Sequence, residues 1–204
     1  ICSNMTSYNK EQYIAERPSP HDWVGHSNYQ ILQHYKHLIT SRNVLDIGCN
    51  HGAVTKLITT LDPTSVTGVD INENALYKAR TEYIEDKFAN VEFIQWDAAS
   101  DQEFPIKDAK YDVICTFHTL EHIWPDHLAQ FVKNVINLLA VNGALIVVVP
   151  FETSYNDPTH VSFFNHATLA TLIQNNENMT TIEILDPMRW NDPNILVGLF
   201  KRIA

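Results

Sequence analysis

Short apolar segments alternate with amphipathic segments along most of this chain, and that alternation limits the possible folds more than any other feature of the sequence. The apolar segments have the length of buried strands, and the segments between them repeat apolar residues at helical spacing. This pattern predicts a parallel sheet with helices on both faces, because a helix must return the chain to the start of each new strand. The expected strands are residues 43–47, 65–70, 91–96, 111–117, 144–149, 180–185 and 195–200. The helical patterns lie within residues 27–40, 53–58, 75–84, 128–139 and 165–174.

The strongest helical pattern is that of residues 128–139. Trp124-Pro125-Asp126 is predicted to begin this helix, since proline is tolerated in a first turn. Asn142-Gly143 is predicted to end it, since glycine commonly follows the last turn of a helix. Right-handed crossovers then give a doubly wound sheet, which binds ligands at the carboxyl ends of its strands near the switch in strand order.

The size of the chain predicts one folded domain with an N-terminal extension. It has 204 residues, of which 45% are hydrophobic, enough to fill a core. Residues 1–25 are polar, include Pro18 and Pro20, and are interpreted as an arm or linker; residues 26–204 form the expected domain. Because the first residue is Ile1 and not methionine, the chain is interpreted as a fragment of a longer protein.

Charge and cysteine content narrow the expected partners. Fourteen Lys and Arg against 24 Asp and Glu give a net charge of −10, with no basic cluster, so nucleic acid is not an expected partner. The longest apolar run, 144–149, is far shorter than the roughly 18 residues of a membrane span. Three cysteines without the spacing of a disulfide framework indicate a cytoplasmic protein.

The turn after the first strand is a candidate ligand loop. It reads Asp46-Ile-Gly48-Cys49-Asn50-His51-Gly52. Its glycines let the backbone turn sharply and approach a ligand closely. The loop lacks the G-x-G-x-x-G spacing of dinucleotide-binding proteins, which disfavours a nicotinamide cofactor. The acidic Asp46 suits a ligand that carries a positive group.

Two more carboxylates follow the next strands. Asp70 ends the second strand, about 20 residues beyond the glycine-rich turn, where an acidic residue accepts hydrogen bonds from a ribose diol. Asp97-Ala98 follows the third strand and can read the amino group of an adenine. Ile71 or Trp96 can cover the ring.

These motifs, taken together, resemble those of class I S-adenosylmethionine-dependent methyltransferases, especially members that act on small molecules. The chain has D-x-G-x-x-x-G after strand one, an acid after strand two, "WDA" after strand three and "LEH" after strand four, and the likeness covers residues 28–203. The resemblance implies a Rossmann-like, seven-stranded, mostly parallel sheet with an antiparallel C-terminal strand. It also implies S-adenosylmethionine as cofactor and methyl transfer to an O or N atom of a small molecule such as a sugar or metabolite.

The family pattern implies a role for each matching position. Asp46 would lie near the methionine ammonium of the cofactor. The backbone at Gly48 and Cys49, with the turn at Gly52, would face the methionine part. The remaining implied contacts are Asp70 and Ile71 at the ribose, Asp97 and Ala98 at the adenine, and Phe117 at the amino-acid end. Local capping by Asp70 or Asp97 and plain turn glycines are the structural alternatives.

Candidate catalytic residues follow strands four and five. His118, Glu121 and His122 form H-x-x-E-H, and His160 lies in the loop after strand five, so both loops face one crevice. One interpretation is a general base, for which His118 is the expected residue nearest the reacting methyl group. A second is a divalent metal site, because small-RNA 2′-O-methyltransferases use a similar E-x-x-E-H with a downstream histidine. Three histidines and one carboxylate would favour Zn²⁺, Mn²⁺ or Fe²⁺ over Mg²⁺.

Three alternatives remain open at this point. Glu121 and His122 could simply pack their loop, as "LEH" does in methyltransferases with unrelated substrates. The chain could be a metal-assisted RNA ribose 2′-O-methyltransferase, although it lacks a basic surface. It could also be a methyltransferase-like module that binds partners without catalysis.

Overall fold

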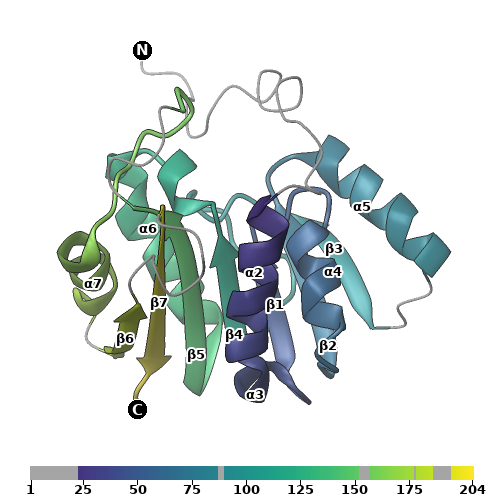
Figure 1. Cartoon of the computed structure of the whole chain (residues 1–204), viewed down its shortest axis with the longest axis horizontal. Coiled ribbons are helices and arrows are strands. Elements are labelled where there is room, and N and C mark those ends of the chain that lie inside the picture. Colours follow the sequence, from purple (N-terminus) through teal and green to yellow (C-terminus); the bar gives the residue numbers. More distant parts are fainter. Residues whose placement is uncertain (1–22, 87–89, 152–156, 177, 186–193) are drawn as a thin grey trace.

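A seven-stranded sheet forms the centre of the computed structural model, which describes residues 23–86, 90–151, 157–176, 178–185 and 194–204 (Figure 1). The strands are β1 (Asn43–Ile47), β2 (Ser65–Asp70), β3 (Val91–Gln95), β4 (Tyr111–Phe117), β5 (Leu139–Pro150), β6 (Met179–Leu185) and β7 (Ile195–Arg202). The helices are α2 (Trp23–His34), α3 (Lys36–Ile39), α4 (Ala53–Thr59), α5 (Glu73–Asp86), the 3₁₀ helix η1 (Leu120–His122), α6 (Pro125–Leu138) and α7 (His166–Gln174).

The strand order is β3-β2-β1-β4-β5-β7-β6, with β1 to β5 parallel and the last two strands antiparallel to their neighbours. This confirms the predicted doubly wound sheet with an antiparallel C-terminal strand. The chain order runs outward in one direction from β1 to β3 and in the other from β4, so the switch lies between β1 and β4. The carboxyl ends of these two strands therefore border the expected ligand crevice.

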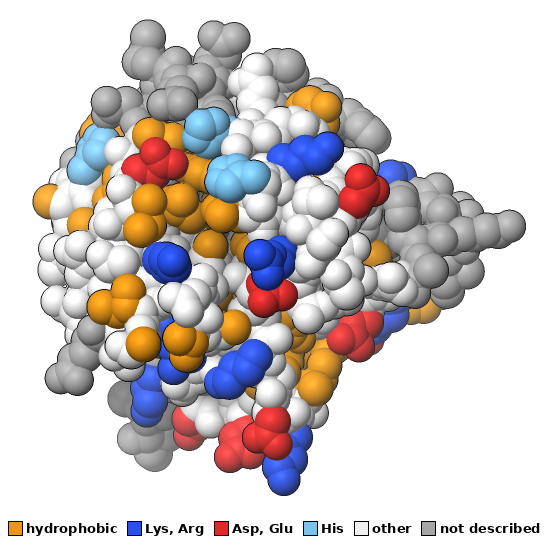
Figure 2. Space-filling view, turned by 90° about the horizontal axis from the view of Figure 1, so that it is seen from below, with side chains coloured by type: hydrophobic (Ala, Val, Ile, Leu, Met, Phe, Trp, Pro, Cys, Tyr) orange, Lys and Arg blue, Asp and Glu red, His pale blue; other side chains and the backbone are white. Residues whose placement is uncertain are grey.

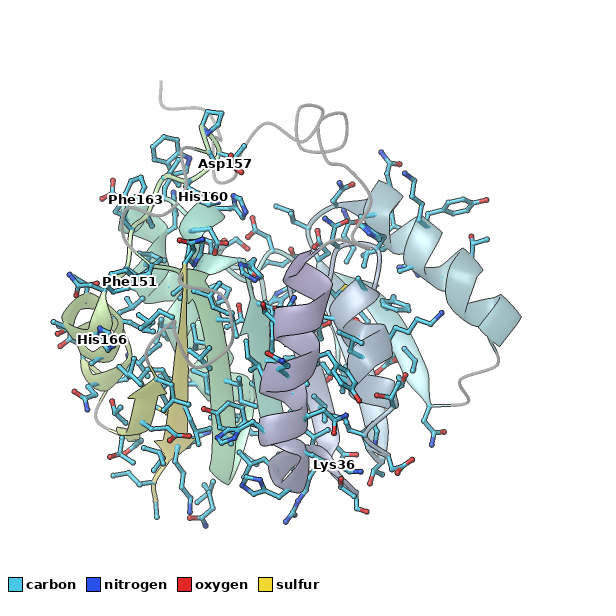
Figure 3. All side chains as sticks on the ribbon, viewed as in Figure 1. Lys36, Phe151, Asp157, His160, Phe163 and His166 are labelled. Carbon is cyan, nitrogen blue, oxygen red and sulfur yellow. The ribbon has the colours of Figure 1, made fainter. Side chains whose placement is uncertain are left out.

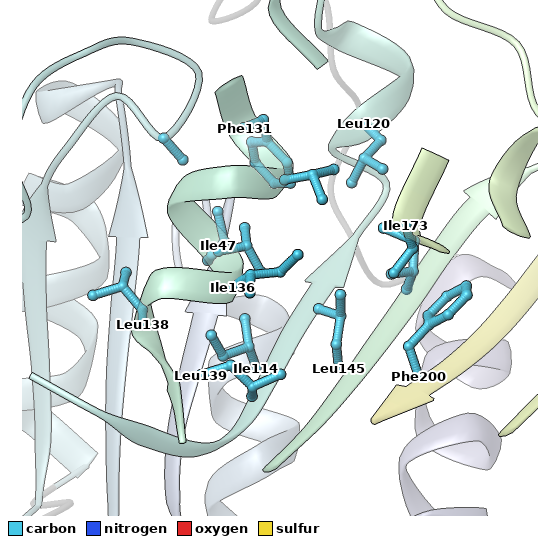
Figure 4. Packing of buried hydrophobic residues seen from close by; sticks show 14 of the residues in the cluster. Ile47, Ile114, Leu120, Phe131, Ile136, Leu138, Leu139, Leu145, Ile173 and Phe200 are labelled. Atoms are coloured by element: carbon cyan, nitrogen blue, oxygen red, sulfur yellow. The ribbon is translucent and has the colours of Figure 1, made fainter. Parts of the chain in front are cut away.

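Apolar side chains from the helices cover both faces of the sheet. On one face, Ile31 of α2, Tyr35 between α2 and α3, and Ile58 of α4 pack with Val113 and Cys115 of β4. On the other face, α6 packs over β1, β4 and β5, and α7 packs against β6 and β7 (Figure 4). The apolar stripes expected from the sequence are the ones that become buried, which is why the helices lie on both faces.

The boundary between α6 and β5 differs from the prediction. The helix ends at Leu138, and Leu139 already pairs with Tyr111 of β4. Asn142 and Gly143 therefore lie inside β5, at a register shift of the strand pair, and Asn142 has the left-handed φ of 66°. Asn142 and Gly143 do favour a turn, but because β5 pairs with β4 from Leu139 onward, that turn lies within the strand and not at the end of the helix.

The remaining predicted elements agree with the structure to within a few residues. The helix expected at 27–40 is formed by α2 and α3, and α7 begins with a capping box in which Asn165 and Thr168 exchange hydrogen bonds. Almost all of the arm predicted for residues 1–25 lies outside the described residues, as does Cys2. Cys49 and Cys115 are buried and not paired in a disulfide.

Two features bear on possible partners: the character of the helices and the distribution of charged side chains on the surface. No helix in the described ranges combines the length and apolar character that a membrane crossing requires. On the face seen in Figure 2, Lys and Arg side chains are interspersed with Asp and Glu.

Candidate functional site

The loop after β1 is a sharp turn held in left-handed backbone conformations. Gly48, Asn50 and Gly52 have φ values of 77°, 50° and 86°. The amides of Gly48 and Cys49 both donate to the carbonyl oxygen of Val69, at 2.8 and 3.0 Å. These two N–H groups are therefore committed to the neighbouring strand, so any contact from here to a ligand must come from other atoms of the loop.

Gly48 is required by its surroundings as well as by its φ. A Cβ atom at this position would lie 2.2 Å from Oγ1 of Thr119. That hydroxyl lies 3.2 Å from the carbonyl oxygens of Ile47 and Phe117, within reach of a hydrogen bond to either. Thr119 thus packs the loop after β4 directly onto the loop after β1.

Asp46 lies beneath this loop and is almost fully buried. Its Oδ2 accepts a 2.6 Å hydrogen bond from the hydroxyl of Thr55 in α4. Burial, with a smaller contribution from the nearby charge of Asp70, raises the pKa of Asp46 to about 7 even though the Thr55 hydrogen bond acts to lower it. Burying an ionised carboxylate is energetically unfavourable, and a cation nearby would offset that cost.

Asp70 joins the first two loops at the strand ends. Its Oδ2 accepts a hydrogen bond from the amide of Asn50 and its Oδ1 one from the amide of Asn72, both at 2.8 Å. Burial raises the pKa of Asp70, although these backbone hydrogen bonds act to lower it. Each carboxylate oxygen has a further lone pair, so local capping leaves room for an additional donor. Ile71, next in the chain, is half-buried at the same edge.

At the tip of β3, Asp97 accepts a 3.0 Å hydrogen bond from the amide of Ala99 and remains partly exposed. Ala98 is buried beside it. Trp96 does not cover this site: it is only 3% exposed, its indole donates to the carbonyl of Gln102, and its ring packs edge-on against Phe104. The suggestion that Trp96 covers a ring is therefore wrong, because the tryptophan turns into the core.

The end of β4 carries the second group of candidate residues. Phe117 is buried, and His118 follows with a left-handed φ of 53° while its amide donates to the carbonyl of Val148 in β5. A positive φ is uncommon for a residue other than glycine and is found in sites where the surrounding structure imposes it. The turn aims the His118 side chain toward Glu121.

Glu121 is the most unusual side chain of this group. It is 2% exposed, and neither carboxylate oxygen accepts a hydrogen bond within the part of the chain that the structure describes. Its Oε1 lies 3.7 Å from Nδ1 of His118 and 4.0 Å from Nε2 of His122. Burial acts to raise the pKa of Glu121, but the two histidines outweigh it and hold that pKa below its ordinary value.

His160 joins this group from the loop after β5, near Asp157 at the upper edge of the molecule (Figure 3). One ligand atom from each of Glu121, His122 and His160 lies within 4.8 Å of the others. We call these three residues and His118 the His/Glu cluster. The amides of Val161 and Ser162 donate to the Glu121 carbonyl, which fixes the two loops together.

The structure thus gathers the sequence-derived candidates into two adjoining groups. The His/Glu cluster follows β4 and β5. The ends of β1, β2 and β3 and the loops after them contribute Asp46, Gly48, Cys49, Gly52, Asp70, Ile71, Asp97 and Ala98. The sequence did not predict Thr55, Thr119 or Thr159, the last of which lies beside Nδ1 of His122 through its carbonyl oxygen (3.2 Å) and hydroxyl (3.1 Å). Lone threonines carry no motif signal, and only their tertiary contacts reveal them.

Comparisons with known proteins agree on one family. A family model described as a methyltransferase domain matches residues 44–143. A probable S-adenosylmethionine-dependent methyltransferase of Mycobacterium tuberculosis is 30% identical over 141 residues, which cover 66% of this chain and 47% of that protein. A phthiotriol/phenolphthiotriol dimycocerosates methyltransferase of Mycobacterium ulcerans is 27% identical and matches 53% of this chain and 37% of that protein. The chain therefore spans about half the length of the curated relatives it matches, or less.

Solved structures share the fold at low sequence identity. The N-methyltransferase NodS of Bradyrhizobium japonicum, solved with S-adenosyl-l-homocysteine, superposes with a TM-score of 0.75 at 17% identity over 96% of this chain and 97% of that one. The cyclase SpnF superposes equally well, with a TM-score of 0.75 at 13% identity over 93% and 85% of the two chains. These likenesses establish the architecture, which hosts more than one chemistry.

Proposed function

This chain belongs to the class I S-adenosylmethionine-dependent methyltransferases, and on that premise we propose that it transfers a methyl group from S-adenosylmethionine to an oxygen or nitrogen atom of a small-molecule acceptor. The observation that carries the proposal is the set of carboxylates at the ends of three adjacent strands. Asp46, Asp70 and Asp97 lie in or just beyond β1, β2 and β3. A cofactor with an ammonium group, a ribose diol and an adenine amine offers a positive charge to Asp46 and hydrogen-bond donors to Asp70 and Asp97.

The residues present fit this cofactor. Asp70 is held by two backbone amides yet keeps lone pairs for the two ribose hydroxyls. Asp97, with the amide of Ala98, would read the adenine, and Ile71 would pack against it. Asp46 lies beneath its loop, so we assign it an electrostatic effect on the ammonium and no direct contact. The carbonyl groups of the Gly48–Gly52 loop and of Phe117 would face the methionine part, because the Gly48 and Cys49 amides are already bonded to Val69.

Methyl transfer requires the acceptor atom to lie in line with the methyl group and its sulfur. Holding the two reactants in that geometry removes much of the entropic cost of their meeting. The loops after β1 and β4 flank the switch in strand order, and Thr119 packs one against the other. We therefore propose that His118, at the end of β4, borders the reacting methyl and that the His/Glu cluster forms the acceptor side.

A small molecule is the acceptor class that the comparisons favour. One relative is named for phthiotriol and phenolphthiotriol dimycocerosates. The chain carries a net charge of −10, whereas binding to nucleic acid phosphates needs clustered Lys and Arg. Mass spectrometry of products, over acceptors that include sugars, lipids and RNA, tests this choice; methylation of RNA alone would contradict it.

The Asp70→Ala variant is expected to bind S-adenosylhomocysteine at least about tenfold more weakly than the unmodified chain. Hydrogen bonds to a charged carboxylate contribute roughly 1.5–3 kcal/mol, and 1.4 kcal/mol corresponds to tenfold in affinity. Isothermal titration calorimetry measures the change. Asp62→Asn is the matched control, because it removes one exposed carboxylate at a left-handed position that asparagine tolerates.

Three results of this calorimetry separate the alternatives. Binding of S-adenosylhomocysteine but not NAD supports the proposal, and binding of neither supports a non-catalytic module. An unchanged dissociation constant in a folded Asp70→Ala protein means that the cofactor site lies elsewhere.

A further inference from the structure

We propose that Glu121, His122 and His160 form a site for one divalent transition-metal ion, with His118 beside it as a candidate fourth ligand. Metal binding itself does not depend on the proposed methyl transfer.

The distances within the cluster suit ligands around an ion better than a direct hydrogen-bond network. Two ligand atoms about 2.0–2.2 Å from one tetrahedral ion lie about 3.3–3.6 Å apart. Glu121 Oε1 is 3.7 Å from His118 and 4.0 Å from His122, well beyond the roughly 2.7–3.2 Å of a hydrogen bond. A small inward shift of the side chains would therefore bring them onto an ion.

The charge of Glu121 also calls for a cation. Its carboxylate is almost fully buried, and no hydrogen bond reaches either oxygen from the residues described. A buried anion is costly unless it is paired or coordinates a metal. A histidine at 3.7–4.0 Å compensates this negative charge only when the histidine is protonated. A divalent ion bound by neutral imidazoles would provide the positive charge itself.

Surrounding groups hold the imidazole ring of His122 as they do around bound metals. Nδ1 of His122 lies 3.2 Å from the carbonyl oxygen of Thr159 and 3.1 Å from its hydroxyl, which leaves Nε2 on the side of Glu121. A histidine that ligates a metal almost always has its other ring nitrogen held by a carbonyl or carboxylate in this manner. Nε2 of His160 lies 3.7 Å from Oδ2 of Asp157, which places a carboxylate beside this ring at more than hydrogen-bond distance.

Two connected loops supply the ligands in a fixed arrangement. Glu121 and His122 lie in η1, while His160 lies in the loop after β5. The carbonyl of Glu121 accepts hydrogen bonds from the amides of Val161 and Ser162, and the Ser162 hydroxyl donates to the carbonyl of Ile123 at 2.6 Å. The site is therefore supported by backbone contacts between the loops.

The donor set selects the class of metal. Imidazole ligands suit Zn²⁺, Mn²⁺ or Fe²⁺, whereas Mg²⁺ and Ca²⁺ require mostly oxygen. Two histidines and one carboxylate leave at least one position open on the ion, as in catalytic sites. If the proposed function is right, that position would take an oxygen of the acceptor next to the methyl group.

The test is direct titration of metal-free protein. After treatment with a chelator and dialysis, we expect one equivalent of Zn²⁺ to bind by calorimetry, and one equivalent of Co²⁺ to give visible absorption bands. Glu121→Gln and His160→Ala should each weaken binding at least about a hundredfold, since even changes of outer partners cost 10–100-fold. His37→Ala is the control, because this exposed histidine lies next to Lys36 at the opposite end of the molecule (Figure 3).

Circular dichroism shows whether each variant is folded, so the metal test does not depend on cofactor binding. S-adenosylhomocysteine binding is measured separately and tests the proposed function. Metal binding that is lost in both cluster variants and retained in His37→Ala supports the site. Absence of metal binding in the unmodified chain overturns it. So does binding that survives Glu121→Gln and His160→Ala, because the ion would then lie elsewhere among the 10 histidines.

Discussion

Replacing Asp46 with asparagine is expected to raise the free energy of unfolding at pH 8 by about 4 kcal/mol. Burial raises the pKa of this carboxyl from 3.8 to about 7, so ionising it in the folded protein is unfavourable. One pKa unit corresponds to about 1.4 kcal/mol, which sets the size of the effect. Asparagine keeps an oxygen that can accept the hydrogen bond from Thr55.

The stabilisation by Asp46→Asn is expected to increase with pH. The folded pKa lies above the unfolded value, so the folded state binds the proton more tightly. The unmodified chain therefore loses stability from this group as pH rises from about 4 to 7, and the variant does not. Urea unfolding at pH 5 and pH 8 measures the difference, which should be roughly 2 to 3 kcal/mol larger at pH 8. An equal difference at both pH values would show that the carboxyl titrates normally.

The same variant should bind S-adenosylhomocysteine more weakly at pH 8, though by less than Asp70→Ala. Asp46 is almost fully buried, so under the proposed function it would act on the ammonium at a distance. If Asp46→Asn makes the protein more stable but weakens its affinity for S-adenosylhomocysteine, the destabilising carboxylate at this position is explained by its contribution to binding. Tighter binding by the variant would remove that explanation.

The strand-end residues could be placed from the sequence because parallel strands bring their carboxyl ends to one edge. Asp70 and Asp97 needed only the strand ends and the strand order. His160 follows the same logic, since β4 and β5 are neighbours and their following loops must meet. These positions depend on topology, which hydrophobic patterning determines.

Details that depend on side-chain packing could not be predicted in this way. Trp96 follows a strand tip, yet its ring turns inward to Phe104 and is buried. The start of β5 depends on the pairing of Leu139 with Tyr111, which overrides the local turn preference of Asn142. The bond of Thr55 to Asp46 joins a helix to a strand, and neither residue signals it alone.

The Gly48→Ala variant is expected to lose about 2–5 kcal/mol of stability. An alanine at a φ of +77° costs roughly 1–2 kcal/mol, and overpacking typically adds about 1–3 kcal/mol. The overlap is specific, because the new Cβ would lie 2.2 Å from Oγ1 of Thr119 and 2.7 Å from its Cγ2. Urea unfolding of the purified variant measures the loss.

A double-mutant cycle separates the backbone cost from the contact. Thr119→Ala removes both of those atoms, so Gly48→Ala should cost about 1–3 kcal/mol less in the Thr119→Ala background than in the unmodified chain. The cost of the left-handed backbone should then remain, together with a closer contact to Cβ of residue 119, which lies 3.0 Å from the new Cβ. Additive effects of the two substitutions would show that Thr119 does not press on Gly48. Because this contact joins the loops after β1 and β4, a measured coupling would mean that the proposed cofactor loop and the His118 turn are packed as one unit. A change in either would then alter the proposed geometry of methyl donor and acceptor.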